Sequence, residues 1–236
     1  MVEAIIAEMS LQEGYLEDKK LQSIYFGGGT PSLLSEGELA GIFEAIYKIY
    51  EVAEDAEITL EANPDDLNGE QLRVLRNSPV NRLSIGVQSF HEADLVFMNR
   101  AHNAKEALYC LKAAQDAGFP DLTIDLIYGV PGLTNGGWQE NLETFLSLEI
   151  PHLSSYCLTV EEGTALHHFV EKGKAPPVDE QLAAQQFELL MDFAERRGYI
   201  HYEISNFARE GHIAKHNTAY WKGVPYLGLG LSLIHI

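Results

Sequence analysis

The stretch SIYFGGGTPS, residues 23–32, decides the fold. Its first four residues are one serine, one isoleucine and two aromatics, which is typical of a buried β-strand. Three glycines follow, and glycine readily adopts the positive φ that a tight turn out of a strand requires. Downstream, Ser35 and Glu38 have the spacing of a helix capping box, and apolar residues then recur at helical spacing from Leu39 to Tyr50. The sequence therefore predicts a strand, a glycine turn and a helix in succession.

The same alternation of strand and helix continues along the chain. Asn103 and Glu106 are placed to cap a further helix, and Gly118 is placed to end it. Paired prolines within 172–177 predict an extended linker. The expected strands are 23–26, 57–61, 82–87, 122–128, 153–159 and 200–205. This α/β alternation predicts parallel strands joined by crossover helices, in either a doubly wound sheet or a barrel-like (β/α) array.

Polar residues at the carboxyl ends of successive expected strands favour the barrel. Glu61 closes the second strand, Gln88 follows the third, and Asp125 lies inside the fourth. Thr159 and Asn206 lie at the ends of the last two. In barrel enzymes these ends converge on one mouth. Because the chain opens in a helical pattern, we expect a β/α array whose first strand is missing from this sequence.

Charge and composition exclude several classes of protein. The 236 residues include 35 Asp plus Glu against 16 Lys plus Arg, a formal charge of −19. A non-specific nucleic-acid binder needs a basic face to displace counterions from phosphate, so nucleic acid is excluded as a partner of this kind. No apolar run in the sequence approaches the ~20 residues of a transmembrane segment. The first residues are acidic, unlike the basic region of a signal peptide. We expect a cytoplasmic globular protein.

Three features could carry chemistry without reference to any known family: the glycine run, Glu61 and Asp125. The glycine run could bring backbone groups within reach of a ligand, but it matches neither G-x-G-x-x-G nor a P-loop, and a plain tight turn remains an alternative. Glu61 is as consistent with a structural acid as with a ligand contact. Asp125 lies in a very apolar run, where a charge is costly unless it meets a partner or a ligand. Function is the favoured interpretation there.

Six blocks of sequence occur together and in order. They are YFGGGTPS (25–32), EANP (61–64), NRLSIGVQSF (81–90), IDLIYGVP (124–131), EISNFA (203–208) and HNTAYW (216–221). Jointly they closely resemble the radical S-adenosylmethionine family that contains oxygen-independent coproporphyrinogen III oxidase and the HemW-type haem chaperones. The resemblance covers about residues 5 to 230, and the last two blocks are similar to the HemW branch.

The resemblance implies a partial (β/α)6 barrel whose mouth holds a [4Fe–4S] cluster and S-adenosylmethionine. It implies residues 1–160 as the partial barrel core, and 161–236 as its completion and the start of a truncated C-terminal region. The residues it implies for S-adenosylmethionine are Gly27, Gly28, Gly29 and Thr30 at the amino-acid part, Glu61 at ribose or ammonium, Gln88, Arg100 and Asp125 in the remaining pocket, and Thr159 as a weaker contact.

The sequence also departs from the family pattern. The family's CxxxCxxC, which ligates the cluster, is not in this sequence, and its two cysteines, Cys110 and Cys157, cannot replace it. Both are expected to be small buried hydrophobes. Residues 231–236 also depart from the pattern. We therefore expect an internal fragment that carries no Fe–S ligands and is non-catalytic as it stands, and no catalytic residue can be named.

His216 is the remaining candidate ligand. Imidazole ligates haem iron, and the resemblance associates HNxxYW with haem binding in the HemW branch. Tyr220 and Trp221 could form aromatic walls for the porphyrin. A histidine that is merely hydrogen-bonded in a loop, with its aromatic neighbours packed on the barrel, remains the alternative.

The resulting hypothesis is a fragment of a HemW-like radical S-adenosylmethionine protein. The parent would bind haem and pass it to apo-haemoproteins. Coproporphyrinogen III oxidase activity in porphyrin biosynthesis is one alternative. A cluster-free binding module on the same barrel is another.

Overall fold

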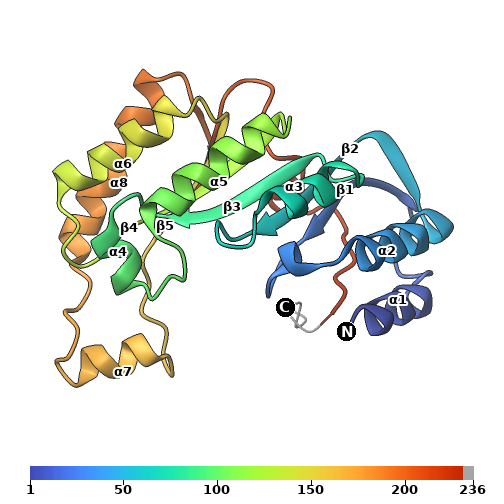
Figure 1. The fold of residues 1–236 in the computed structure, drawn as a ribbon, viewed down its shortest axis with the longest axis horizontal. Coiled ribbons are helices and arrows are strands. Elements are labelled where there is room, and N and C mark those ends of the chain that lie inside the picture. The colour runs from blue at the N-terminus through green and yellow to red at the C-terminus, as the bar shows by residue number, and fades with distance from the viewer. Residues whose placement is uncertain (231–236) are drawn as a thin grey trace.

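Seven strands form one curled sheet in the computed structural model, which describes residues 1–230 (Figure 1). In spatial order they are β1 (Lys20–Phe26), β2 (Glu51–Ala62), β3 (Arg82–Gln88), β4 (Asp121–Tyr128), β5 (His152–Cys157), β7 (Asn206–Ala208) and β6 (Ile200–Glu203). Strands β1 to β5 are parallel neighbours. The predicted partial barrel of α/β class is confirmed.

Helices connect the strands, and several of them pack on the outer side of the sheet (Figure 1). They are α1 (Val2–Leu11), α2 (Glu36–Ile49), α3 (Gly69–Arg76), α4 (Glu92–Phe97), α5 (Ala104–Asp116), α6 (Asn135–Ser147), α7 (Ala165–Glu171), α8 (Glu180–Arg196) and α9 (Lys215–Trp221), with a 3-10 turn, η1, at Pro31–Leu33. Both predicted capping boxes are present, Ser35 with Glu38 at α2 and Asn103 with Glu106 at α5. Gly118 follows α5 with φ +88°, as a helix stop requires.

The last two strands correct the expectation of a wholly parallel sheet. Residues 200–205 do not form one strand beside β5. Instead β6 ends at Glu203, the chain turns, and β7 pairs antiparallel with both β6 and β5. A link this short can join only antiparallel neighbours, because a parallel crossover needs a dozen residues or more.

The two faces of the sheet differ in chemistry because side chains alternate along each strand. On β3, Leu83, Ile85 and Val87 are fully buried in the apolar core with the helices. The intervening Ser84 and Gly86 border the concave side. Strand β4 repeats this pattern, and so the apolar core lies between sheet and helices while the inner face is polar.

A polar cluster closes the amino ends of β3 and β4. Arg82 lies 3.5 Å from the Glu57 carboxylate and donates to Thr123 Oγ1 at 3.1 Å. The Glu57 carboxylate also accepts the backbone N–H groups of Lys215 and His216, at 2.9 and 3.0 Å. Helix α9 is therefore attached to the concave side of the sheet by its first turn.

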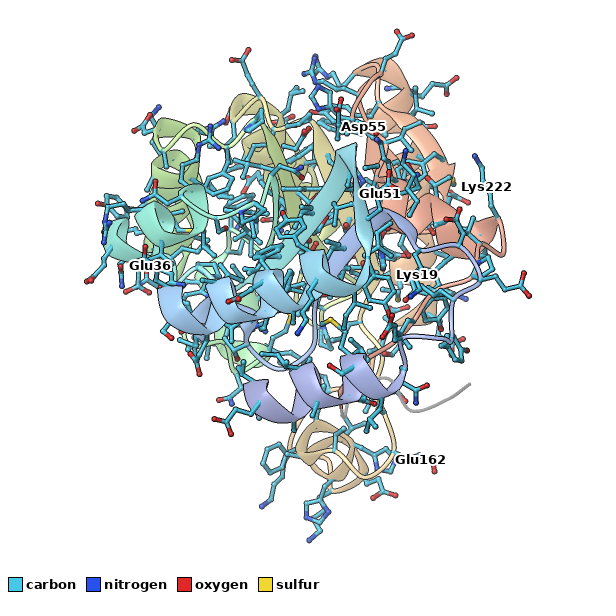
Figure 2. The ribbon with its side chains drawn as sticks, turned by 90° about the vertical axis from the view of Figure 1, so that its right-hand side faces the viewer. Lys19, Glu36, Glu51, Asp55, Glu162 and Lys222 are labelled. Atoms are coloured by element: carbon cyan, nitrogen blue, oxygen red, sulfur yellow. The ribbon has the colours of Figure 1, made fainter. Side chains whose placement is uncertain are left out.

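Most acids of the N-terminal quarter are solvated. Figure 2 shows Glu36, Glu51 and Asp55 projecting from the surface, and each is exposed. Glu57 is the exception, with only 9% of its surface exposed. Among the described residues, no helix is long and apolar enough to cross a bilayer.

Candidate functional site

The turn after β1 requires glycine at three successive positions. Crowding is the reason at the first position, and backbone conformation is the reason at the next two. A Cβ on Gly27 would lie 2.7 Å from Cε1 of Tyr25 and 3.0 Å from Oε1 of Glu61, too close for any side chain. Gly28 and Gly29 have φ of +73° and +64°, a region that residues with a Cβ rarely adopt. The turn therefore needs all three glycines.

Glu61, at the carboxyl end of β2, holds this turn in place. Its Oε1 accepts from the Tyr25 hydroxyl at 2.7 Å, and its Oε2 accepts from the Gly28 N–H at 3.1 Å. Burial, followed by the negative charge of Glu61, raises the pKa of Tyr25 far above its usual range. The phenol therefore remains a hydrogen-bond donor to the carboxylate at neutral pH.

A polar pocket opens beside the turn at the carboxyl ends of the strands. Six of the predicted contact residues line it: Gly29, Thr30, Glu61, Gln88, Arg100 and Asp125. Gly27 and Gly28 lie next to it in the turn. The structure thus brings together residues at the carboxyl ends of β1 to β4 and Arg100 from the segment between α4 and α5, as the barrel hypothesis predicts for the strand ends.

Thr159 does not line this pocket. The expected strand 153–159 is observed as β5, which ends at Cys157, so Thr159 lies two residues beyond it and is exposed. Its neighbour Leu158 still donates its N–H to Tyr128 O at 2.8 Å. The chain leaves the sheet after that contact.

Arg100 supplies an oriented cation. Its Nη2 donates to Asn63 Oδ1 at 2.8 Å and to Gly86 O at 3.3 Å. Its Nε is buried and makes no hydrogen bond within the described part of the chain. A buried guanidinium donor without a partner is costly, and this one borders a pocket. The Arg100 guanidinium lines the pocket and can pair with a ligand carboxylate there.

Asp125 supplies a carboxyl group to the same pocket. Ser84 Oγ donates to its Oδ1 at 3.2 Å. Burial, and next the negative charge of Glu61, raise the pKa of Asp125 to about 7, against the lowering effect of its serine partners and of Arg100. The group is therefore poised between its neutral and ionised forms near neutral pH.

These charges suit a zwitterionic ligand. Two carboxyl groups, Glu61 and Asp125, can receive a cation or a hydroxyl donor, and Arg100 can receive an anion. The backbone of Gly29 and Thr30 adds further polar groups at the rim. The pocket can bind and orient such a molecule.

Six further residues line the pocket, and the sequence pattern did not identify them as contacts: Pro31, Ser32, Ala62, Asn63, Ser84 and Gly86. A Cβ on Gly86 would lie 2.8 Å from Nε2 of Gln88 and 3.4 Å from Nη2 of Arg100, so glycine makes room for both side chains. Gln88 itself has φ +70°, unusual for a residue with a side chain. A glycine inside an apolar strand is the signal that could have identified Gly86, because it marks a close approach.

His216 lies outside the pocket, on α9. Its Nδ1 is 3.1 Å from Ser23 Oγ, its ring stacks on Tyr25 with centroids 4.6 Å apart, and Tyr220 meets it edge-on at 5.1 Å. Trp221 turns away and donates its indole N–H to Glu203 Oε2 at 3.0 Å. Only one of the two predicted aromatic walls therefore touches the imidazole.

The chain's own residues do not fit a cysteine-ligated iron–sulfur cluster. Cys110 is buried in α5, where burial raises its pKa to about 12. Cys157 is exposed at the end of β5, contrary to the prediction that both would be buried. Among residues 1–230, no group of three or more His, Cys, Asp or Glu is placed to hold a metal ion.

Comparison with known proteins places these features in context. A profile of the Radical SAM superfamily matches residues 6–145. The heme chaperone HemW of Lactococcus lactis is 38% identical over 97% of this chain and 60% of its own length. HemW of Bacillus subtilis is 38% identical over 89% of this chain and 56% of its own length. The chain thus spans a little over half the length of these relatives.

The solved structures agree with the observed architecture. Coproporphyrinogen III oxidase (HemN) from Escherichia coli superposes with a TM-score of 0.78 over 94% of this chain and 51% of its own, at 24% identity. Archaeal Elp3 from Methanocaldococcus infernus superposes with a TM-score of 0.63, over 80% of this chain and 48% of its own, at 16% identity. At these identities the likeness concerns the fold.

Proposed function

This chain belongs to the radical SAM superfamily, and from that premise we propose that it is part of a HemW-type, haem-binding chaperone. In this proposal the polar pocket holds S-adenosylmethionine and His216 ligates haem iron. The parent would bind haem and deliver it to apo-haemoproteins in the cytoplasm. The names of the HemW relatives support the haem assignment.

One observation carries the proposal, namely how His216 is held. Ser23 engages Nδ1, whereas Nε2 makes no hydrogen bond to any described residue. Burial lowers the pKa of His216, against a small raising effect of Glu57. A neutral imidazole with one nitrogen fixed and the other open is the form that ligates a metal.

The pocket fits the methionine end of S-adenosylmethionine. Arg100 would receive its carboxylate, Glu61 its ammonium or a ribose hydroxyl, and Asp125 would face its cationic part. When bound, this molecule supplies a sulfonium cation. Without a cluster iron to chelate the methionine group, we expect a dissociation constant in roughly the high-micromolar to millimolar range.

The test of haem ligation is His216→Ala, titrated with haem beside the wild-type chain. Loss of the imidazole removes a ligand, so the Soret band should shift or broaden, while weak apolar adsorption of the porphyrin persists. His168→Ala, at an exposed histidine on α7, is the matched control and should keep the wild-type spectrum.

Thermal melting of each variant accompanies the titration, because His216→Ala also removes the contacts to Ser23 and Tyr25. A purely structural role predicts a lower Tm with an unchanged Soret band. That outcome would remove His216 from the ligand set. A His216→Gln variant, which keeps polar atoms near Ser23, should fold better and still lack the ligand.

A further inference from the structure

Two residues of one strand connect His216 to the polar pocket. Ser23 and Tyr25 are separated by one residue on β1, so their side chains lie on the same face of the sheet. Ser23 Oγ contacts Nδ1 of His216 at 3.1 Å. Tyr25 places its ring against the same imidazole, with an interplanar angle of 20°. Strand β1 therefore touches the imidazole at its edge and on its face.

The other end of Tyr25 belongs to the pocket. Its hydroxyl donates to Glu61 Oε1 at 2.7 Å, and Glu61 lines the pocket. A single rigid side chain thus spans from the imidazole to the carboxylate. The other oxygen of the Glu61 carboxylate, Oε2, accepts a hydrogen bond from the Gly28 N–H. Glu61 therefore also connects Tyr25 to the glycine turn.

Tyr25 has little freedom to move independently of these partners. Its ring edge lies so near the Gly27 backbone that a Cβ there would be 2.7 Å away. The ring is confined by His216 on one face and by the glycine turn at its edge. A shift of the hydroxyl therefore moves the ring that supports the imidazole.

We propose that Tyr25 is a positioning residue that couples the pocket to His216, so that a ligand hydrogen-bonded to Glu61 weakens haem ligation. The inference rests on the proposed function. In the observed arrangement both Glu61 oxygens already accept a hydrogen bond, from Tyr25 and from Gly28. An ammonium or hydroxyl group of the ligand competes for Oε1, the Tyr25 contact lengthens, and the support of His216 is lost.

Thermodynamic linkage makes this coupling measurable from either side. If S-adenosylmethionine weakens haem binding by some factor, haem must weaken S-adenosylmethionine binding by the same factor. Loss of one charge-assisted hydrogen bond corresponds to roughly a ten- to a hundredfold change, and we expect a part of it, about fivefold or more, to reach His216. Haem is titrated into the wild-type chain with and without saturating S-adenosylmethionine, and the ratio of dissociation constants is the readout.

Tyr25→Phe keeps the ring and removes the hydroxyl that reaches Glu61. We expect the ratio of dissociation constants to fall from about five or more to about one in this variant, whatever happens to the affinity itself. Tyr109→Phe, at a tyrosine 74% exposed on α5, is the matched control and should retain the wild-type ratio. A merely structural role for Tyr25 would change Tm but leave the ratio intact.

The outcomes separate the two proposals. Haem binding that depends on His216, with a wild-type ratio of one, overturns the coupling and leaves the proposed function standing. A ratio that survives in Tyr25→Phe also overturns it. A haem spectrum indifferent to His216, or a pocket that takes no S-adenosylmethionine at millimolar concentration, removes the proposed function and the coupling with it.

Discussion

Gly27 and Gly29 are two residues apart and are required for different physical reasons. Gly27 is crowded by the Tyr25 ring and the Glu61 carboxylate. Gly29 has open space around its Cα but a φ of +64°. Substitution by alanine therefore meets a steric clash at the first and only backbone strain at the second.

Gly27→Ala should displace the glycine turn that borders the pocket, because the added Cβ would clash with Tyr25 and Glu61. We expect a loss of stability of about 1–3 kcal/mol from the clash and at least tenfold weaker S-adenosylmethionine binding. Gly37→Ala, in α2 with nothing near its Cα, is the control and should be neutral or stabilising. Urea unfolding and calorimetric titration give the two readouts. If Gly27→Ala and Gly37→Ala had the same stability to urea and the same affinity for S-adenosylmethionine, the packing argument would be contradicted.

Asp125 should make the fold less stable as pH rises. Its pKa is raised to about 7 in the folded protein, mainly by burial and next by Glu61, whereas an unfolded Asp titrates near 4. The folded state therefore binds the extra proton between about pH 4 and 7. The favourable contribution is complete below the unfolded pKa and is lost as pH passes the folded one.

The variant Asp125→Asn removes this titration. Its Tm relative to wild type should increase from pH 4 to pH 7 and then level off. Asp116→Asn, at an exposed position on α5, should show no such trend. A flat difference for Asp125→Asn across the same range would mean that the carboxyl is ionised throughout.

At the scale of elements, α9 depends on a strand for its place. Seven residues are too few for a helix to persist alone in water, and α9 lacks a side-chain cap at its own N-terminus. The Glu57 carboxylate from β2 accepts its first N–H groups instead and also faces Arg82. One buried acid thus secures the helix that carries His216.

Glu57→Ala should be among the costlier substitutions in the chain. It leaves the buried Arg82 without its carboxylate partner and the first turn of α9 without an acceptor, a loss of about 3 kcal/mol or more. Glu57→Gln keeps one acceptor oxygen and the shape, and we expect it to lose less. Urea unfolding ranks the three proteins. A Glu57→Ala chain as stable as wild type would show that this cluster does not stabilise the fold.

The sequence predicted most elements because their signals are local. Capping boxes, glycine stops and runs of β-formers each act within a few residues. The pairing of β7 with β5 was missed because it depends on the tight turn after Glu203 rather than on the strand pattern itself. Local pattern therefore defines the elements better than it defines their partners.

At the scale of the molecule, convergence of the strand ends was predictable and the contacts between sites were not. Glu61, Gln88 and Asp125 meet because parallel strands share one mouth. The contact of Ser23 with His216 joins residues 193 apart. It depends on how α9 packs against β1, which no local pattern encodes. The resemblance to a family identified His216 but gave no reason to look at Tyr25.

Residues on the polar inner face of the sheet and residues that face the apolar core should differ in their tolerance to mutation. Along β3 and β4, substitutions at Leu83, Ile85, Leu122 or Ile124 should lower the abundance of folded protein. Substitutions at Ser84 or Asp125, on the inner face of the same strands, should leave abundance closer to wild type and reduce ligand binding. A pooled library of variants can be sorted once for abundance of folded protein and once for binding of S-adenosylmethionine. Along each strand, positions where substitution lowers abundance should therefore alternate with positions where it lowers binding. Such a scaffold can acquire a new ligand by changing every second residue, while its core stays untouched.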